Sequence, residues 1–221
     1  MGFGPRRVSR GEEWRVGVGR TPAFYRRFTG LDRPPERMEE WLRIPEESLA
    51  TCTNGRLFRD PLGDFTRRRQ ALLAYYPEDL RLKKIASLCI TIAQTGQYNY
   101  ARSLKRADHF AAAYSAVTFA ANAIRLVFLL NRRFAPFYKW LHRAVQDLPA
   151  LGPEVHRQIE SLLTEEDAGR KADVMESVSV LLADALRGQG LSDSESDFLL
   201  DHAPQVQSKI SDARLRQHLT A

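Results

Sequence analysis

Residues 109–131 constrain the fold of this chain most, because they form a long apolar run that follows a helix-capping residue, Asp108. Asn122 and Arg125 interrupt the run, and an amide or a cation near the centre of a bilayer would be costly. The run therefore predicts a buried helix and not a membrane span. Its expected buried stripe has a 3,4 spacing and consists of Phe110, Tyr114, Val117, Ala121, Ile124, Phe128 and Asn131.

A second, polar line follows the same predicted helix and consists of Ser115, Thr118, Asn122 and Arg125. Buried polar groups without a partner are costly, so this line either pairs inside the fold or faces a cleft. The sequence leaves these two alternatives open.

Helical patterns also dominate the rest of the chain. Asp64 is the expected cap of one helix, Gly96 is expected to end another, and Ser192–Glu195 matches a capping box. The capping box predicts a final helical pair that reaches about residue 218. Only residues 14–19 alternate as a strand does. The remaining predicted helices are 22–29, 36–43, 46–53, 64–75, 77–95, 136–147, 153–164 and 168–187.

The charge of the chain is unevenly distributed. Residues 71–150 carry eleven Lys and Arg against four Asp and Glu, whereas residues 151–221 carry seven against thirteen. This split favours a local anionic ligand over a surface that is basic everywhere. Cys52 and Cys89 lie in helical surroundings without CxxC spacing, which predicts reduced, structural thiols in a cytoplasmic protein.

The positive centre contains the strongest candidate for a binding site, residues 128–143. There an apolar helix is expected to end in a cluster of cations and aromatic rings, which together suit the phosphates and base of a nucleotide. The alternative is purely structural, with arginines over the last helix carbonyls and aromatics filling a corner. The histidines lack metal-binding spacing, and no metal site is predicted. The predicted nucleotide- or substrate-binding residues are Lys139, Asn131, Arg132, Arg133, Arg125, Asn122, Lys84, Tyr98, Tyr100 and Tyr138.

Four motifs resemble the domain-of-unknown-function 4037 family. They are GRLFRDPLGDFTRRRQALLAYYPEDLRLKKIA (55–86), GQYNYAR (96–102), FLLNRRFAPFYKW (128–140) and LSDSESDFLLDHA (191–203). The resemblance implies the helical region that follows a polymerase-β-like nucleotidyltransferase core in bacterial proteins. The helical half also resembles, distantly, the C-terminal domain of aminoglycoside and lincosamide nucleotidyltransferases. By that resemblance Lys139 would touch phosphate, while Asn131 and Arg132 would shape the substrate side.

The chain departs from the family at its start. It opens Met1-Gly2-Phe3-Gly4-Pro5-Arg6, as though cut just after the metal-binding aspartates of the relatives, and residues 14–19 hold no further carboxylate. Two-metal nucleotidyl transfer needs carboxylates that hold Mg²⁺. We therefore expect no catalysis by this chain alone, and Mg²⁺ and a nucleoside triphosphate only if a complete core is supplied. Whether the chain is an enzyme stays open.

The sequence thus predicts a mainly α fold, a helical bundle preceded by a short remnant of an α/β nucleotidyltransferase core. The remnant spans residues 1–62 and the helical binding domain residues 63–221. The expected function is binding of a nucleotide or small-molecule substrate by the helical domain. The alternatives are an RNA- or tRNA-binding module, and a non-catalytic partner of a separate catalytic chain. Self-association is also expected, through the unpaired strand at residues 14–19.

Overall fold

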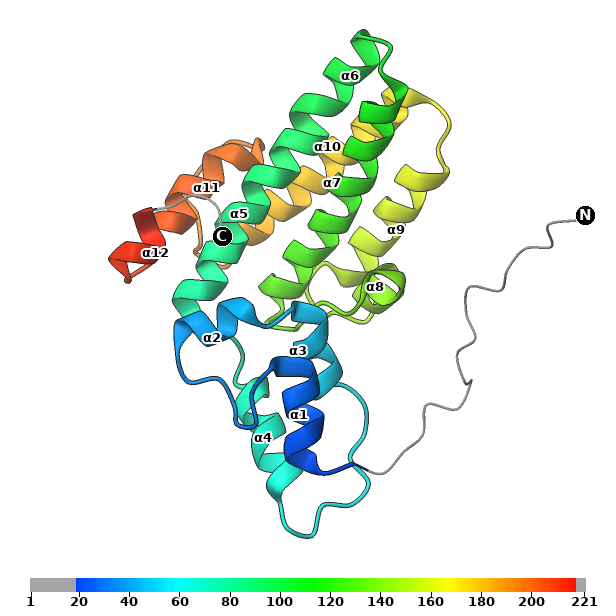
Figure 1. The fold of residues 1–221 in the computed structure, drawn as a ribbon. Helices are drawn as coiled ribbons and strands as arrows, with labels where there is room; N and C mark the ends of the chain where they lie inside the picture. Colours follow the sequence, from blue (N-terminus) through cyan, green and yellow to red (C-terminus); the bar gives the residue numbers. More distant parts are fainter. Residues whose placement is uncertain (1–18, 218–221) are drawn as a thin grey trace, which may run out of the picture.

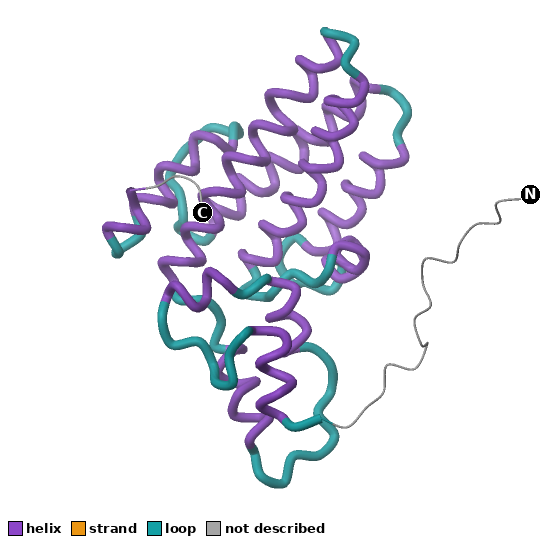
Figure 2. Tube along the Cα trace, in the orientation of Figure 1, coloured by secondary structure: helices purple, strands orange, loops and turns teal. Residues whose placement is uncertain are grey.

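The computed structural model describes residues 19–217, and every regular element in this range is helical (Figures 1 and 2). Helix α7 lies at the centre of an antiparallel bundle and packs against the other long helices. Helix α5 continues through a π-helix, η1 (Ala93–Tyr100), into α6 (Ala101–Lys105). The long helices of the bundle are α5 (Glu78–Ile92), α7 (His109–Leu130), α9 (Gly152–Thr164) and α10 (Ala168–Gly188).

Shorter helices cover one end and one side of the bundle. Below it in Figure 1, α1 and α4 pack on α3, and α8 lies near the carboxyl end of α7. Helix α11 packs along α5, and α12 follows it. These helices are α1 (Thr21–Thr29), α2 (Met38–Arg43), α3 (Glu46–Thr53), α4 (Asp64–Leu73), α8 (Tyr138–Val145), α11 (Leu199–Ser208) and α12 (Ala213–Gln217).

The predicted helical bundle is confirmed. Asp108 caps α7 as expected, because its Oδ1 accepts a hydrogen bond from the N–H of Ala111 at 2.9 Å. The expected strand at residues 14–19 lies outside the described residues except for Gly19, and residues 19–217 show no α/β remnant. The predicted domain boundary at residue 62 falls in the loop between α3 and α4, two helices that pack together.

The N-terminus of α4 differs from the prediction. Asp64 is the first helical residue and not the cap, and Gly63 holds the cap position with φ of 67°. The carboxylate of Asp60 instead accepts a hydrogen bond from the N–H of Thr66 at 2.7 Å, which lowers the pKa of Asp60. Asp64 turns to Arg68, with 3.1 Å between Oδ1 and Nε.

The first half of α7 buries a different face from the predicted one. Phe110, Tyr114 and Val117 are 81%, 63% and 59% exposed, so the prediction is wrong for these three residues. The buried face instead carries small residues around one ring, Phe119, which is fully buried. Small side chains let neighbouring helices approach closely, and the burial pattern follows that approach rather than side-chain size. The small buried residues of this face are Ala112, Ser115, Ala116, Ala120 and Ala123.

Gly96 does not end a helix, contrary to the prediction. It lies inside η1, where a Cβ atom would sit 2.2 Å from Cδ2 of Phe119. The missing side chain therefore makes room for the Phe119 ring of α7, and the helical run passes on into α6.

The predicted capping box at 192–195 is also wrong, because α11 begins only at Leu199. Residues 192–198 form a loop in which each serine hydroxyl accepts the N–H two residues ahead. Ser192 Oγ accepts from Ser194 at 3.2 Å, and Ser196 Oγ accepts from Phe198 at 3.1 Å. Such local bonds let serine compete with helix formation.

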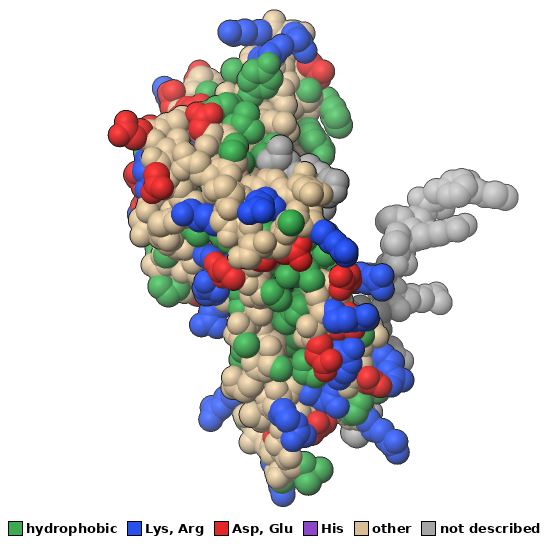
Figure 3. Space-filling view, turned by 90° about the vertical axis from the view of Figure 1, so that its left-hand side faces the viewer, with side chains coloured by type: hydrophobic (Ala, Val, Ile, Leu, Met, Phe, Trp, Pro, Cys, Tyr) green, Lys and Arg blue, Asp and Glu red, His purple; other side chains and the backbone are tan. Residues whose placement is uncertain are grey.

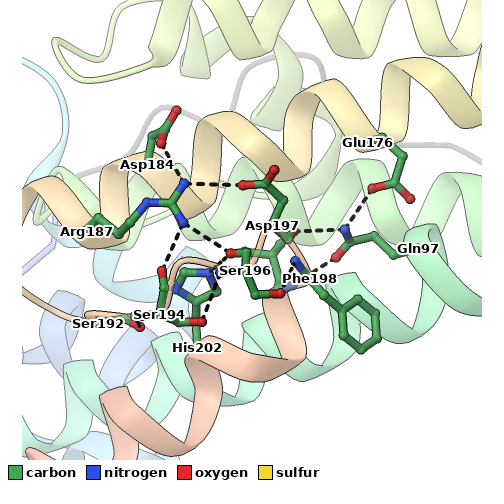
Figure 4. A network of polar contacts seen from close by, with 11 residues as sticks. Gln97, Glu176, Asp184, Arg187, Ser192, Ser194, Ser196, Asp197, Phe198 and His202 are labelled. Atoms are coloured by element: carbon green, nitrogen blue, oxygen red, sulfur yellow. Dashed lines mark hydrogen bonds and ion pairs between the residues drawn. The ribbon is translucent and has the colours of Figure 1, made fainter.

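Side chains from the bundle hold this loop in place (Figure 4). The amide of Gln97 in η1 donates to Asp197 O at 2.9 Å and accepts from the N–H of Leu199, also at 2.9 Å. Arg187 of α10 donates to the carbonyls of Ser194 and Ser196 at 3.0 and 3.1 Å. The loop is therefore tied to both η1 and α10.

Helix α7 is long and apolar enough to cross a membrane by length and composition alone. In its most apolar window, 61% of the residues are buried inside the bundle. The helix is thus the core helix of the fold, as the sequence predicts. Cys52 and Cys89 are buried free thiols, and burial raises their pKa to about 11 and about 12.

The Gly96–Phe119 contact predicts a large effect of one methyl group. Gly96→Ala should destabilise the fold by about 1–3 kcal/mol, the usual cost of overpacking a core. Urea unfolding followed by circular dichroism measures the change. Gly188→Ala is the matched control, because a Cβ there meets nothing within 4 Å, and it should leave the midpoint unchanged or raised. Equal midpoints for the two variants would contradict this packing.

Glu40 predicts a pH dependence of stability. Its carboxylate is only 8% exposed and accepts hydrogen bonds from Arg33 and Arg37 and from the N–H of Glu36. The Arg33 hydrogen bond is the main cause that holds the pKa of Glu40 well below its usual range. A depressed pKa stabilises the fold above the unfolded value of about 4.3, and this stabilisation is lost as the pH falls through the folded pKa.

Glu40→Gln should therefore unfold at lower urea than wild type at neutral pH, and the gap should narrow steadily below about pH 4. Glu39→Gln removes an exposed carboxylate one residue away and serves as the control. A gap that stays constant between neutral and acid pH would show that the Glu40 carboxylate is not the titrating group.

Candidate functional site

The carboxyl end of α7 forms a corner that presents two arginines. The N–H of Arg133 donates to Phe128 O at 3.0 Å, and that of Arg132 donates to Leu129 O at 3.2 Å. This pair of bonds is a Schellman motif, in which the αL position is usually glycine. Arg132 occupies that position with φ of 52°, a conformation that is uncommon for a residue with a side chain.

Tyr75 opposes this corner from the turn between α4 and α5. It too has a left-handed backbone, with φ of 77°, and its hydroxyl donates to Arg133 O at 3.2 Å. Its ring centre lies 4.8 Å from that of Phe134, and the Tyr76 ring lies 5.0 Å from Phe134 on another side. Two left-handed residues and three packed rings thus fix the corner, and such backbone strain is common at functional sites.

A cavity of about 360 Å³ opens at this corner between α3, α4 and the end of α7. Arg132 pairs with Glu78 at 2.8 Å. Arg133 is exposed and forms no ion pair within residues 19–217. The lining therefore combines largely apolar walls with two arginines, Arg132 and Arg133, and one acidic residue, Asp147. Its lining residues are Ala50, Thr53, Asn54, Leu73, Tyr75, Phe128, Arg132, Arg133, Phe134, Asp147, Leu148 and Pro149.

A second polar cluster surrounds Glu46, at the start of α3. Its Oε1 accepts the N–H of Ala135 at 3.2 Å, and Arg125 Nη1 lies 4.0 Å from its Oε2. Burial raises the pKa of Glu46, and the nearby Lys84, the Ala135 N–H and Arg125 oppose this rise. Lys84 Nζ also lies 5.2 Å from the centre of the Tyr76 ring. Glu46 thus ties the residue after Phe134 to α3, one wall of the cavity.

The structure brings together five of the predicted site residues near this corner. Arg132 and Arg133 line the cavity, and Lys84 and Arg125 flank Glu46. Asn131 adjoins them, but both ends of its amide bond to the backbone of Ala150 at 2.9 Å. Asn131 therefore holds the loop that carries the cavity residues Leu148 and Pro149.

The other predicted residues lie elsewhere. Lys139 and Tyr138 are exposed on α8 outside the cavity lining, with Lys139 Nζ 5.7 Å from the Trp140 ring. Asn122 is half-buried one turn before Arg125 on α7.

Tyr98 and Tyr100 belong to η1, which packs against α7 from its middle, at Phe119, and so lies away from the corner at the carboxyl end of α7. Tyr98 is 50% exposed, whereas Tyr100 is buried, and burial raises its pKa. These two tyrosines do not line the cavity.

Sequence reasoning missed three parts of the site. Glu46 matched a helix N-terminus, Tyr75 gave no sign of its left-handed backbone, and Asp147 matched an ordinary helix end. The consecutive Tyr75 and Tyr76 before Pro77 were the one available signal, since such a pair suits a packed turn. Their contact with Phe134, 58 residues or more along the chain, has no local signature.

Two of the histidines, His142 and His156, lie next to each other. The rings of His142 and His156 stack with centres 4.1 Å apart, and His142 Nε2 lies 3.0 Å from His156 O. Between residues 19 and 217 no three or more His, Cys, Asp or Glu side chains form a group that could hold a metal ion.

Residues 41–141 match the family described as a domain of unknown function, DUF4037. The chain resembles that family. The DUF4037 match runs from α2 into α8 and includes the cavity wall from Ala50 to Phe134, whereas Asp147–Pro149 and the 191–203 motif lie beyond it. No curated protein and no solved structure matches the chain.

Because the backbone of Arg132 is left-handed, the glycine variant at this position should be more stable than the alanine variant, the reverse of the usual order in a helix. Arg132→Gly should be more stable than Arg132→Ala by about 1 kcal/mol, because a Cβ atom is disfavoured in the left-handed region. Both variants lose the Glu78 ion pair equally, so the comparison isolates the backbone. Thermal or urea unfolding of the two proteins tests this order. A more stable Arg132→Ala than Arg132→Gly would contradict the Schellman geometry.

Proposed function

We propose that the cavity at the end of α7 binds a phosphate-bearing small molecule, and that a nucleotide is the class it suits best. The observation that carries the proposal is Arg133, a guanidinium without an ion pair among residues 19–217, at a cavity with aromatic walls. Guanidinium groups bind phosphate through two parallel hydrogen bonds. The cavity volume of about 360 Å³ lies within the range of small-molecule sites.

The neighbouring groups support one orientation of the proposed ligand. The phosphate would face Arg133 and Arg132, and the flatter, less polar part would face Phe128 and Phe134. Arg132 already pairs with Glu78, which also accepts from Arg81 at 2.7 Å. A phosphate could therefore replace Glu78 as the partner of Arg132, because Glu78 would keep its hydrogen bond from Arg81. Arg132 would strengthen binding, and Arg133 would provide the first anchor.

The family resemblance extends this proposal to nucleotidyl transfer in the cytoplasm. In that setting the helical domain would hold the nucleotide or the acceptor substrate. Carboxylates of a polymerase-β-like core, on the same or another chain, would hold Mg²⁺. The part assigned to residues 19–217 is binding and orientation.

Isothermal titration and thermal shift with AMP, adenosine, ATP, GTP, CTP and UTP test the proposal. A phosphate-bearing ligand should raise the melting temperature by mass action, and adenosine should bind more weakly than AMP. Arg133→Gln should weaken AMP binding about tenfold, since a hydrogen bond to a charged group contributes about 1.5–3 kcal/mol. Mg²⁺ should hardly change the rise in melting temperature that a nucleotide causes in this chain by itself.

Two variants sharpen the test. Arg143→Gln makes the same charge change on an exposed residue of α8 outside the cavity, and it should bind as wild type does. Lys139→Ala tests the phosphate contact that the family resemblance assigns to this lysine. If no nucleotide stabilises the protein, or if Arg133→Gln and Arg143→Gln bind alike, the cavity is not a phosphate site.

A further inference from the structure

The end of the bundle opposite the cavity carries exposed cations. Helix α6 and its turn into α7 present Arg102, Lys105 and Arg106, all exposed, and none forms an ion pair in the described part of the chain. The one carboxylate of this turn, Asp108, is engaged as the cap of α7. Figure 3 shows Lys and Arg side chains gathered at this upper end of the molecule, with hydrophobic side chains close to them.

Aromatic rings lie exposed beside these cations. Phe110 and Tyr114, one turn apart on α7, are 81% and 63% exposed, and their rings are nearly parallel at 21° with centres 6.3 Å apart. Tyr98 is 50% exposed, and the Arg102 guanidinium lies 4.5 Å from its ring centre. No buried contact accounts for these exposed rings, and Phe110 and Tyr114 lie on the face of α7 that the sequence predicted to be core.

We propose that this α6–α7 tip, defined by Tyr98, Arg102, Lys105, Arg106, Phe110 and Tyr114, binds single-stranded nucleic acid. Cations that follow phosphates, next to flat rings on which bases stack, are the features of such surfaces. A duplex would leave the rings unused, because its bases are already stacked. An acidic protein would use the cations but not the nearly parallel ring faces. This function goes beyond the proposed cavity ligand and does not depend on it.

The acidic turn at the same end limits where the strand can run. Glu165, Glu166 and Asp167 lie between α9 and α10, and two of them also accept local hydrogen bonds. Glu165 Oε1 accepts the N–H of Glu166 at 2.8 Å, and Asp167 Oδ1 accepts the N–H of Arg170 at 2.8 Å. These carboxylates would repel a phosphate backbone. The strand is therefore expected to follow α6 and the first turns of α7, away from the α9–α10 turn.

Fluorescence anisotropy with labelled single-stranded RNA and DNA of about 12 nucleotides tests the proposal. Binding should weaken strongly between about 50 and 200 mM salt. The double variant Arg102→Gln and Arg106→Gln should bind less, and its salt slope should be shallower by about 0.7 for each phosphate that these arginines neutralise in wild type. Tyr114→Ala should weaken binding about tenfold, since stacking on an aromatic ring contributes about 1–3 kcal/mol per base.

The controls carry the same chemistry elsewhere on the molecule. Arg143→Gln repeats the charge change on α8, and Phe58→Ala removes a ring that is 86% exposed and paired with Arg56 at 5.5 Å. Both should bind as wild type does, and so should the cavity variant Arg133→Gln, which separates this proposal from the cavity ligand. Circular dichroism confirms folding of each variant.

Three results would overturn the proposal. They are the absence of binding at about 50 mM salt, equally weakened binding in the tip and control variants, and self-association that Phe110→Ala abolishes without any nucleic-acid binding. The last would assign the tip to an interface between copies of this chain.

Discussion

The buried carboxyl end of α7 is the constraint on which the bundle depends, because carbonyls at a helix end must find donors. Arg81, only 3% exposed, donates from Nε to Leu129 O at 3.1 Å, and Gln189 donates to Leu130 O at 3.1 Å. Burial lowers the pKa of Arg81, and Glu78 counters this effect. Side chains of α5 and of the residue after α10 thus join at one point of α7, and the corner with Arg132 starts from this fixed end.

Much of the helical layout was predictable because its signals are local. Asp108 marks the start of α7, and the acidic first turn of α3 marks its beginning. The buried face of α7 was not predictable in the same way. The hydrophobic periodicity placed large rings such as Phe110 in the core and gave the alanines less importance. Where helices pack closely, however, small side chains are the ones buried and large ones are left outside. Only the approach of Phe119 to Gly96, two elements apart, reveals which face is buried.

For the candidate site, the sequence predicted its cations but not its shape. Arg132 and Arg133 follow an apolar helix, and this order alone suggests an anion site. The cavity, however, needs Tyr75 from another turn and Asp147 from beyond α8. Glu46 is similar, since its partners Lys84 and Arg125 are distant in sequence. Tertiary contacts, and not local patterns, decide which predicted residues share a site.

The π-helix η1 determines how α6 is rotated about the helix axis relative to α5. Its hydrogen bonds span one residue more than those of α5 and α6, so the helical path holds an extra residue between them. The wider turns absorb this residue, so α6 keeps nearly the orientation that it would have on an uninterrupted α-helix one residue shorter. If the same residues formed an ordinary α-helix instead, α6 would rotate by about 100° relative to α5. The wide turns of η1 therefore decide which side chains the α6 end presents, while the packing of α5 and α7 sets the bundle below it.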